Sequence, residues 1–150
     1  MIITVEGNIL GSGADALVNP VNCKGVWGAG LALQFKTQYP QAYMSHRTAA
    51  KAGAIQIGDI HVSPVGDGQT PPYYLFNFPT KRHWTDKSRL QDIRAGLESL
   101  SETCEDMSVS SVAIPALGCG LGGLRWEPVS REIYEVMETV DVTTLLYVPR

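Results

Sequence analysis

Short apolar runs that suit β-strands alternate along this chain with longer stretches of helical periodicity, and this alternation constrains the fold most. Such a pattern is typical of an α/β sheet with helices on both of its faces. The first two apolar runs, at 2–5 and 16–18, indicate buried strands. Further strands are expected at 59–62, 73–77, 111–115 and 143–148, and helices at 31–39, 40–50, 88–104 and 126–140.

The clearest of these helices is expected to begin at Ser88. Ser88 and Gln91 have the spacing of a capping box, in which each side chain bonds the backbone amide of the other residue. An apolar stripe at helical spacing predicts that one face of this helix packs on the sheet. The stripe consists of Leu90, Ile93, Leu97, Leu100 and Cys104.

Composition limits the chain to one domain. A length of 150 residues and an apolar fraction of 44% suit a single core, so residues 1–150 are expected to form one unit. The N-terminus lacks a signal-peptide pattern, and no apolar run approaches the roughly 18 residues of a membrane span. We expect a soluble, cytoplasmic protein without membrane contact. Cys23, Cys104 and Cys119 lack metal-ligand spacing, so neither a metal site nor a cofactor is expected.

The overall charge of −3 argues against a protein that coats nucleic acid, because that mode needs a broad basic face. The local charge differs, since residues 81–94 hold five of the twelve basic residues and only two acids. This basic stretch is either a solvated surface or the rim of a site for an anionic ligand. Its members are Lys81, Arg82, Lys87, Arg89 and Arg94, with the acids Asp86 and Asp92.

A glycine loop at 118–123 follows one expected strand and precedes a helix. It contains the G-x-G-x-x-G pattern of dinucleotide-binding proteins. A nucleotide-binding βαβ unit would continue with a further strand and an acidic ribose ligand about 20 residues later, for which this chain has no room. Glycine still allows backbone amides to approach a diphosphate, and the following helix N-terminus favours the anion. The alternative is a loop that is merely tight.

A second glycine loop, at 25–30, also leads into a helix, so two loops could hold one diphosphate from opposite sides. Asn19 and Asn22 precede it, near the end of an expected strand. Amide side chains can hold ribose hydroxyls as donors and acceptors, but Asn19 stands before Pro20, where a turn is an adequate explanation. From the residues alone we favour a turn for Asn19 and a ligand contact for Asn22.

A third loop, expected at 78–84, concentrates lysine, arginine, histidine and tryptophan beyond an apolar strand. Lys81 within it is a phosphate counter-charge, a nucleophilic amine or a solvated surface residue. His83 has no identifiable acidic partner, and His46 and His61 are assigned no role. Neither a G-x-S-x-G motif nor a carboxylate pair for one pocket is evident in the sequence.

With these three loops in view, the chain resembles the macrodomain family over essentially its whole length. The supporting motifs are Val5-Glu6-Gly7-Asn8-Ile9, Ala16-Leu17-Val18-Asn19-Pro20-Val21-Asn22 and Ile114-Pro115-Ala116-Leu117-Gly118-Cys119-Gly120-Leu121-Gly122-Gly123-Leu124. The third loop, Phe78-Pro79-Thr80-Lys81-Arg82-His83-Trp84, is especially similar to the bacterial DNA ADP-ribosyl glycohydrolase antitoxins. Within the family, the chain most resembles the branch that holds the human terminal ADP-ribose protein glycohydrolase and these antitoxins.

The resemblance implies a three-layer α/β/α macrodomain with a mixed central sheet. It implies an ADP-ribosyl hydrolase that removes mono-ADP-ribose from thymine in single-stranded DNA, from acidic protein side chains, or from both. An antitoxin-like protein would also have a toxin partner. The alternative on the same fold is a reader module that binds ADP-ribose without cleaving it. A dinucleotide oxidoreductase is disfavoured, because the second βαβ half is missing.

The resemblance also implies the site residues. Asn22, at the distal ribose, and Lys81 would be catalytic. The implied ADP-ribose contacts are Asn8, Ile9, Asn19, Gly28, Ala29, Gly30, Leu31, Ala32, Pro79, Thr80, Gly118, Cys119, Gly120, Leu121, Gly122, Gly123 and Tyr147.

Two positions depart from the family pattern. Asn8 stands where many macrodomains have an aspartate for the adenine amino group, so adenine selectivity would rest on other groups, with Tyr147 beside the ring. Gly122 stands where the human protein glycohydrolase has a catalytic aspartate. A lysine-and-aspartate mechanism therefore does not carry over whole. Because only a neutral amine is a nucleophile, we favour Lys81 as a proton donor or electrostatic stabiliser.

Overall fold

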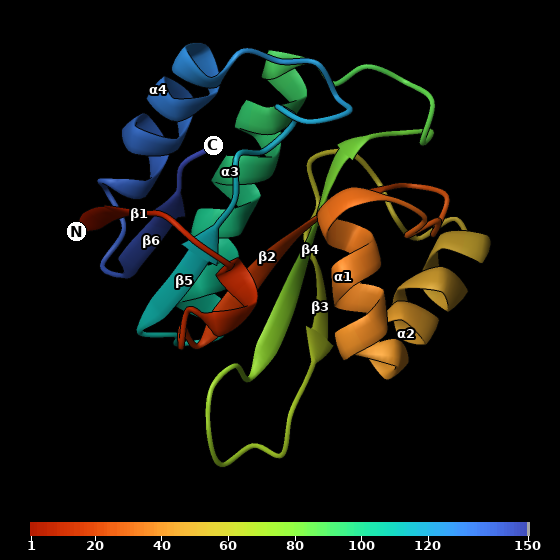
Figure 1. Cartoon of the computed structure of the whole chain (residues 1–150), viewed down its shortest axis with the longest axis horizontal. Coiled ribbons are helices and arrows are strands. Elements are labelled where there is room, and N and C mark those ends of the chain that lie inside the picture. The colour runs from red at the N-terminus through yellow and green to blue at the C-terminus, as the bar shows by residue number, and fades with distance from the viewer. Residues whose placement is uncertain (150) are drawn as a thin grey trace.

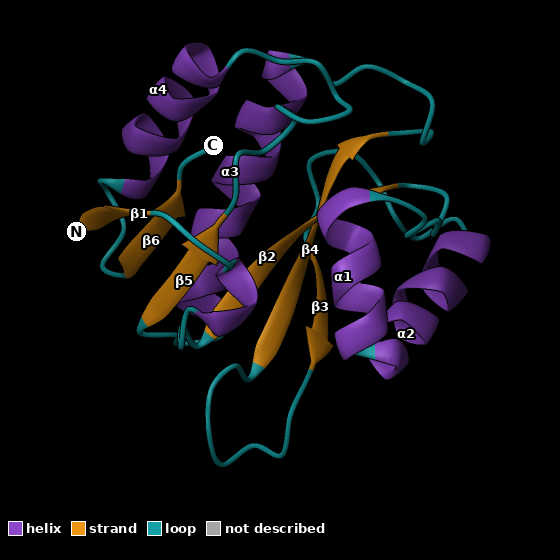
Figure 2. Cartoon of the chain, viewed as in Figure 1, coloured by secondary structure: helices purple, strands orange, loops and turns teal. Residues whose placement is uncertain are grey.

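The computed structural model describes residues 1–149, which form a mixed six-stranded sheet between two pairs of helices (Figures 1 and 2). The strand order is β1-β6-β5-β2-β4-β3, and only β3 runs antiparallel to its neighbour. The three-layer α/β/α class and the mixed sheet are confirmed. The elements are β1 Ile2–Val5, η1 Ile9–Gly11, β2 Ala16–Asn22, α1 Gly30–Gln38, α2 Pro40–Lys51, β3 His61–Pro64, β4 Tyr74–Lys81, α3 Leu90–Asp106, β5 Ser111–Ile114, α4 Trp126–Met137 and β6 Thr143–Tyr147.

Apolar burial divides into two cores, one on each face of the sheet. Helices α3 and α4 cover one face, where Phe78 and Leu146 point, while α1 and α2 cover the other, where Leu17 and Leu75 point. Parallel strands with helices on both faces are buried throughout, and accordingly most of β2 and most of β4 are buried, although Pro20 in β2 is partly exposed. No helix within residues 1–149 is both long and apolar enough to cross a membrane.

Several strand predictions need correction. The run at 2–5 is an edge strand that pairs only with β6, and Ile3 is 41% exposed, so it is not buried as predicted. The strand predicted at 16–18 continues to Asn22 through Pro20, and the one predicted at 73–77 continues to Lys81. The strand predicted at 59–62 lies instead at 61–64. Each shift follows from pairing with a neighbouring strand, which local sequence patterns do not reveal.

The capping box predicted at Ser88 is wrong. Helix α3 begins at Leu90, and its N-cap residue is Arg89, which makes no side-chain cap bond. Ser88 lies outside the helix, where its backbone amide donates to the carbonyl of Gly122 at 3.0 Å and its hydroxyl is buried. Ser88 therefore links the loop between β4 and α3 to the glycine loop at 118–123 through this hydrogen bond. The predicted apolar stripe of α3 is confirmed, since Ile93, Leu97 and Leu100 are fully buried.

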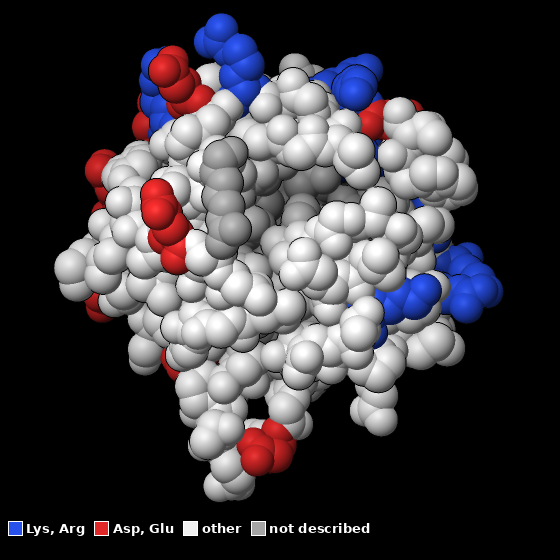
Figure 3. Space-filling view, in the orientation of Figure 1, with Lys and Arg blue, Asp and Glu red and all other residues white. Residues whose placement is uncertain are grey.

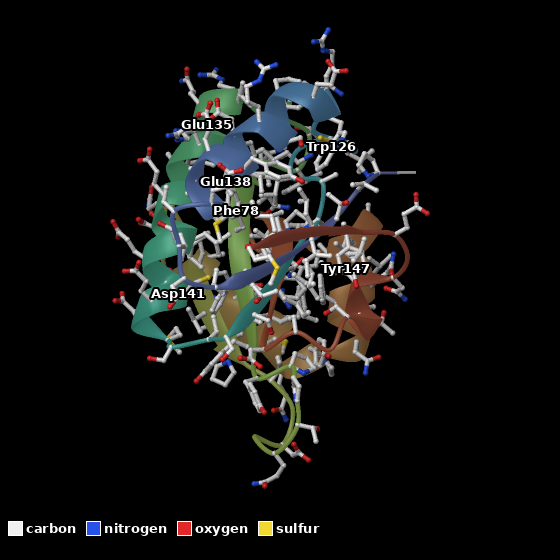
Figure 4. All side chains as sticks on the ribbon, turned by 90° about the vertical axis from the view of Figure 1, so that its left-hand side faces the viewer. Phe78, Trp126, Glu135, Glu138, Asp141 and Tyr147 are labelled. Atoms are coloured by element: carbon white, nitrogen blue, oxygen red, sulfur yellow. The ribbon has the colours of Figure 1, made fainter. Side chains whose placement is uncertain are left out.

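Helix α3 approaches β4 closely at Gly96, which packs against the ring of Phe78 in the core. Figure 4 labels Phe78. A Cβ atom at Gly96 would overlap this ring, and Phe78 has no exposed surface toward which it could move. We expect Gly96→Ala to lower the free energy of unfolding by about 1–2 kcal/mol, because overpacking outweighs the better helix propensity of alanine.

Chemical denaturation of Gly96→Ala, Phe78→Leu and the double variant measures this effect. Leucine is smaller than phenylalanine, so the double variant should lose less stability than the sum of the two single variants. Strict additivity would show that the Gly96 contact with Phe78 does not limit the packing of α3.

Candidate functional site

The carboxyl ends of the five parallel strands lie along one edge of the sheet (Figure 1). The loops after β1, β2, β4 and β5 begin at this edge. They include both glycine loops, whereas the third loop, expected at 78–84, begins only at Arg82, because residues 78–81 belong to β4. Ligands of open α/β sheets bind beyond the carboxyl ends of the strands. This edge is therefore the candidate site.

A cavity of about 410 Å³ opens at this edge, and Figure 3 shows the surface hollowed between α1 and the loop after β5. Its described lining carries no charged side chain, so it suits an uncharged, flat group such as a nucleobase. The lining residues are Gly7, Asn8, Ile9, Leu31, Gln34, Pro115, Ala116, Tyr147, Val148 and Pro149.

Asn8, Ile9, Leu31 and Tyr147 were singled out in the sequence, and the structure brings all four to this cavity. The Asn8 side chain caps the short helix η1, since its Oδ1 accepts from the amide of Leu10 at 3.0 Å. The Tyr147 ring packs beside the α1 and α2 side of the sheet, away from α3 and α4 (Figure 4). Tyr147 is thus placed to lie against a bound ring, whereas Asn8 mainly shapes the wall.

Gln34 and Ala116 line the cavity but were missed in the sequence. Gln34 follows Leu31 by three residues on α1, so helical spacing would have placed both side chains on one face. Ala116 follows β5 immediately and belongs to the motif that ends in the glycine loop. Val148 and Pro149 follow β6, and nothing in their residue types signals a site.

Residues 118–123 form a compact loop between β5 and α4. The amide of Gly123 donates to the carbonyl of Gly120 at 3.1 Å, and the amide of Leu124 donates to Gly118 at 2.9 Å. Within residues 1–149, the amides of Gly120, Leu121 and Gly122 donate to no protein acceptor. Successive unpartnered amides form a concave site for anions such as a diphosphate.

The glycines of this loop have different structural roles. A Cβ at Gly122 would overlap the Ser88 side chain and the carbonyl of Gly118, whereas Gly120 has no neighbour within 4 Å of such an atom. Gly122 is therefore required by the loop itself, and Gly120 borders open space. Cys119 adds no charge, because burial raises the pKa of its thiol, and the sulfur lies 3.6 Å from the carbonyl of Leu117.

The second glycine loop ends at the N-terminus of α1. Its N-cap residue, Ala29, has no side-chain acceptor for the amides of the first turn, which belong to Gly30, Leu31 and Ala32. Gly28, Ala29 and Gly30 are exposed. Unsatisfied amides and the helix dipole both favour an anion at such an end.

Asn22 and Lys81 are cross-strand partners at the carboxyl ends of β2 and β4. A β-bulge between Val21 and Asn22 shifts the register, so Asn22 lies opposite Lys81 and Thr80 lies between two pairs. The backbone ladder continues one step further, where the amide of Cys23 donates to the carbonyl of Arg82 at 2.9 Å. The two residues that the resemblance implies as catalytic are thus neighbours.

The side chains of this pair are positioned by their own loops. Asn22 Nδ2 donates to the carbonyl of Val26 at 2.7 Å, and its Oδ1 accepts from the amides of Lys24 and Val26. Lys81 Nζ donates to the carbonyl of Trp84 at 2.9 Å. The Asn22 amide therefore already stabilises the loop after β2, and one Nδ2 hydrogen remains for a ligand.

Asn19, Pro79 and Thr80 are buried in the sheet. The turn predicted for Asn19 is wrong, because its Nδ2 donates to Asn77 Oδ1 at 3.1 Å within the strand pair β2 and β4. Thr80 Oγ1 lies 3.4 Å from the carbonyl of Val21. The side chains of these residues support the strands that carry Asn22 and Lys81.

The basic stretch separates into two parts. Arg94 bridges α3 and α4 through Glu132 and Glu135, each at 2.7 Å, and also contacts Glu98 at 3.2 Å. Arg94 is therefore structural. The remaining basic residues Lys81, Arg82, Lys87 and Arg89 lie between the end of β4 and the start of α3.

His46 on α2 and His61 on β3, to which the sequence assigned no role, belong to a buried polar network. Trp27 Nε1 donates to His46 Nδ1 at 3.0 Å, and His61 Nδ1 lies 3.1 Å from Asn77 Nδ2. Burial and the neighbouring His61 lower the pKa of His46 from 6.5 to about 4, and burial lowers the pKa of His61 in the same direction. Both imidazoles are thus neutral in the folded protein at pH 7.

These pKa values predict acid sensitivity. An unfolded chain protonates His46 near pH 6.5 and the folded protein only near pH 4, so stability is lost as the pH falls across this window. We expect His46 to account for about 2–3 kcal/mol of the loss in unfolding free energy. The matched variant His46→Asn keeps an acceptor for Trp27 and does not titrate. Denaturation curves at pH 7 and pH 4 should show a smaller pH effect in the variant, and equal pH effects would contradict the assignment.

No group of three or more His, Cys, Asp or Glu residues within 1–149 is arranged to hold a metal ion. Among residues 1–149, the polar groups that the site offers a ligand are instead backbone amides, amide side chains, one tyrosine and one lysine.

Comparison with known proteins agrees with this fold. A protein of Mycobacterium tuberculosis named DNA ADP-ribosyl glycohydrolase is 41% identical over 99% of this chain and 42% of its own length. The macrodomain of Mycobacterium tuberculosis DarG has a TM-score of 0.96 at 40% identity, covering 100% of this chain and 99% of that one. Thermosipho africanus DarTG in complex with ADP-ribose has a TM-score of 0.92 at 31% identity, covering 99% of this chain and 41% of that one.

This chain spans about two fifths of the length of that curated relative. A family model described as Macro domain matches residues 18–133, which is more than half of the chain. The resemblance inferred from the three loops is therefore confirmed, and the chain belongs to the Macro domain family.

Proposed function

We propose that this protein is an ADP-ribosyl hydrolase that binds ADP-ribose and releases mono-ADP-ribose from a modified macromolecule. The observation that carries the proposal is the pairing of Asn22 with Lys81, at the strand ends beside two loops with unpartnered amides. A binding module needs the anion-binding loops, but it has no need of a lysine at the scissile end of the ligand.

The proposed binding mode assigns one part of ADP-ribose to each part of the site. The adenine lies in the uncharged cavity against Tyr147, with Asn8 and Ile9 in its wall. The diphosphate lies between the amides at 118–123 and the N-terminus of α1. The distal ribose then meets the remaining Nδ2 hydrogen of Asn22.

The proposed chemistry is hydrolysis at C1 of the distal ribose. The bond from C1 to the acceptor breaks, a water molecule supplies the hydroxyl to C1, and a proton reaches the departing acceptor. A departing base or carboxylate gains negative charge, which a lysine ammonium group stabilises or neutralises by donating a proton. Lys81 Nζ donates to the carbonyl of Trp84 at 2.9 Å, and this bond favours one position of the ammonium group before substrate arrives.

We propose thymine in single-stranded DNA as the preferred acceptor, with acidic protein side chains as the weaker one. The similarity, over 99% of this chain, to a protein named DNA ADP-ribosyl glycohydrolase supports this preference, as does the basic segment next to Lys81. We further propose a cytoplasmic setting and a partner toxin that attaches the ADP-ribose, as the resemblance to the antitoxins implies.

The test compares ADP-ribose release by this protein from a thymine-modified oligonucleotide and from a glutamate-modified protein under identical conditions. We expect faster release from the oligonucleotide. Release only from the protein would contradict the DNA preference, and release from neither substrate would contradict the hydrolase.

A further inference from the structure

The most distinctive surface outside the ADP-ribose site is an aromatic pair, His83 and Trp84, surrounded by basic residues. The two rings stack with centroids 3.7 Å apart and an interplanar angle of 27°, and Trp84 is 48% exposed. An exposed tryptophan whose ring stacks on a single neighbour leaves its other face to solvent. Such a face is a platform for an unpaired base, because every nucleobase has a π-surface.

A short turn holds this pair in place. The amide of His83 donates to Asp86 Oδ2 at 3.1 Å, and the amide of Asp86 donates back to the carbonyl of His83 at 3.0 Å. Thr85 adds two contacts with His83 Nδ1, one from its amide at 3.2 Å and one from its hydroxyl at 2.7 Å. Asp86, one of the acids in the basic stretch, is therefore committed to the turn.

The charge around the pair is positive. Lys87 and Arg89 are exposed, and Arg82 is exposed with only a distant ion pair, 3.9 Å from Asp92. Arginine and lysine beside a stacking platform are the combination that binds single-stranded nucleic acid. The chain as a whole carries a net charge of −3, so this local excess of positive charge runs against the overall balance.

The platform is directly joined to the ADP-ribose site. The backbone carbonyl of Trp84 accepts the hydrogen bond from Lys81 Nζ, while the indole ring of the same residue is exposed. On the other side, Lys87 Nζ contacts the carbonyl of Leu121 at 3.4 Å in the glycine loop. A strand whose modified base reaches Lys81 would therefore bring a flanking nucleotide next to the residue that carries this platform.

We propose that residues 82–89 form a subsite for the single-stranded DNA that flanks the modified base. One neighbouring base stacks on Trp84, and Arg82, Lys87 and Arg89 contact the backbone phosphates. Two experiments test this proposal, and we call them the binding arm and the turnover arm. The turnover arm rests on the proposed hydrolase, whereas the binding arm needs no hydrolysis.

The binding arm measures fluorescence anisotropy of a labelled, unmodified oligothymidylate of ten nucleotides at low salt. Trp84→Ala should weaken binding about tenfold or more, Trp84→Phe should retain most of it, and Arg89→Gln should reduce the salt dependence by about one phosphate contact. Met44→Ala, which alters an exposed apolar residue on α2, is the matched control and should bind normally. Equal binding by Trp84→Ala and the unaltered protein would overturn the subsite.

The turnover arm compares ADP-ribosyl-thymidine nucleoside with the same modified thymine inside a ten-nucleotide strand. Trp84→Ala should lower kcat/KM about tenfold on the strand and far less on the nucleoside, because only the strand offers a flanking base. Equal losses on both would assign Trp84 to positioning of Lys81 and overturn the subsite. Failure of the unaltered protein to act on either substrate would count against the hydrolase, and the binding arm would still decide the subsite.

Discussion

Replacement of Lys81 by alanine is expected to lower kcat for ADP-ribose release about 100-fold or more. This is the order of effect for a positioned proton donor or for an electrostatic group that acts in the transition state. Affinity for free ADP-ribose should change far less, because Asn22, the cavity and the two amide-rich loops hold the ground state. Single-turnover kinetics and calorimetry on the same protein preparation separate the two quantities.

The matched control for this variant is Lys51→Ala. It removes an exposed amine in the last turn of α2, outside the loops assigned to ADP-ribose. This control should lose less than tenfold in kcat on the thymidine nucleoside. Full turnover by Lys81→Ala would show that Lys81 is not catalytic, and equal losses of binding and turnover would make it a ligand-holding cation.

Gly120→Glu is expected to abolish ADP-ribose binding while the protein stays folded. A side chain at Gly120 meets no protein atom within 4 Å, so the loop itself can accommodate it. The added carboxylate would point into the space beside the unpartnered amides and repel a diphosphate. Calorimetry with ADP-ribose and circular dichroism on the same sample measure both properties, and normal affinity would show that the diphosphate binds elsewhere.

Gly122→Ala provides the structural contrast to this variant. Its Cβ would overlap Ser88 and the carbonyl of Gly118, so we expect a lower melting temperature as well as weaker binding. A single methyl group at Gly122 should thus harm the fold more than a whole carboxylate side chain at Gly120. The reverse order would contradict the separate roles assigned to the two glycines.

The sequence alone predicts the fold class and the strand ends at which the candidate site lies. Alternating strands and helices predict the three layers, and glycine loops before helices predict anion-binding amides. These features depend on residues close in sequence, and the structure places the loops at one edge of the sheet as expected.

Local sequence patterns mislead where a residue far away in the chain decides the conformation. Asn19 before Pro20 has the local signature of a turn, yet Asn77 on β4 receives its hydrogen bond and keeps it in a strand. Ser88 has the local signature of a cap, yet the carbonyl of Gly122 holds it outside the helix. Both partners are more than 30 residues away along the chain, so short-range patterns could not reveal them.

The role of Asn22 shows a further limit of residue-type reasoning. An asparagine at a strand end suits a ribose contact, but three of its hydrogen-bonding positions already organise the loop after β2. Its proposed ligand contact therefore depends on the one remaining Nδ2 hydrogen. Sequence alone gives the type of side chain, whereas the structure shows how much of its bonding capacity is left.

Catalysis, as opposed to ADP-ribose recognition alone, can be measured as the release of ADP-ribose from a thymine-modified oligonucleotide, with the modified strand in large excess over this protein. We expect many turnovers per protein molecule, together with binding of free ADP-ribose to the same site. Tight binding of ADP-ribose with the modified strand left intact would instead rule out the proposed hydrolysis and identify the protein as a reader.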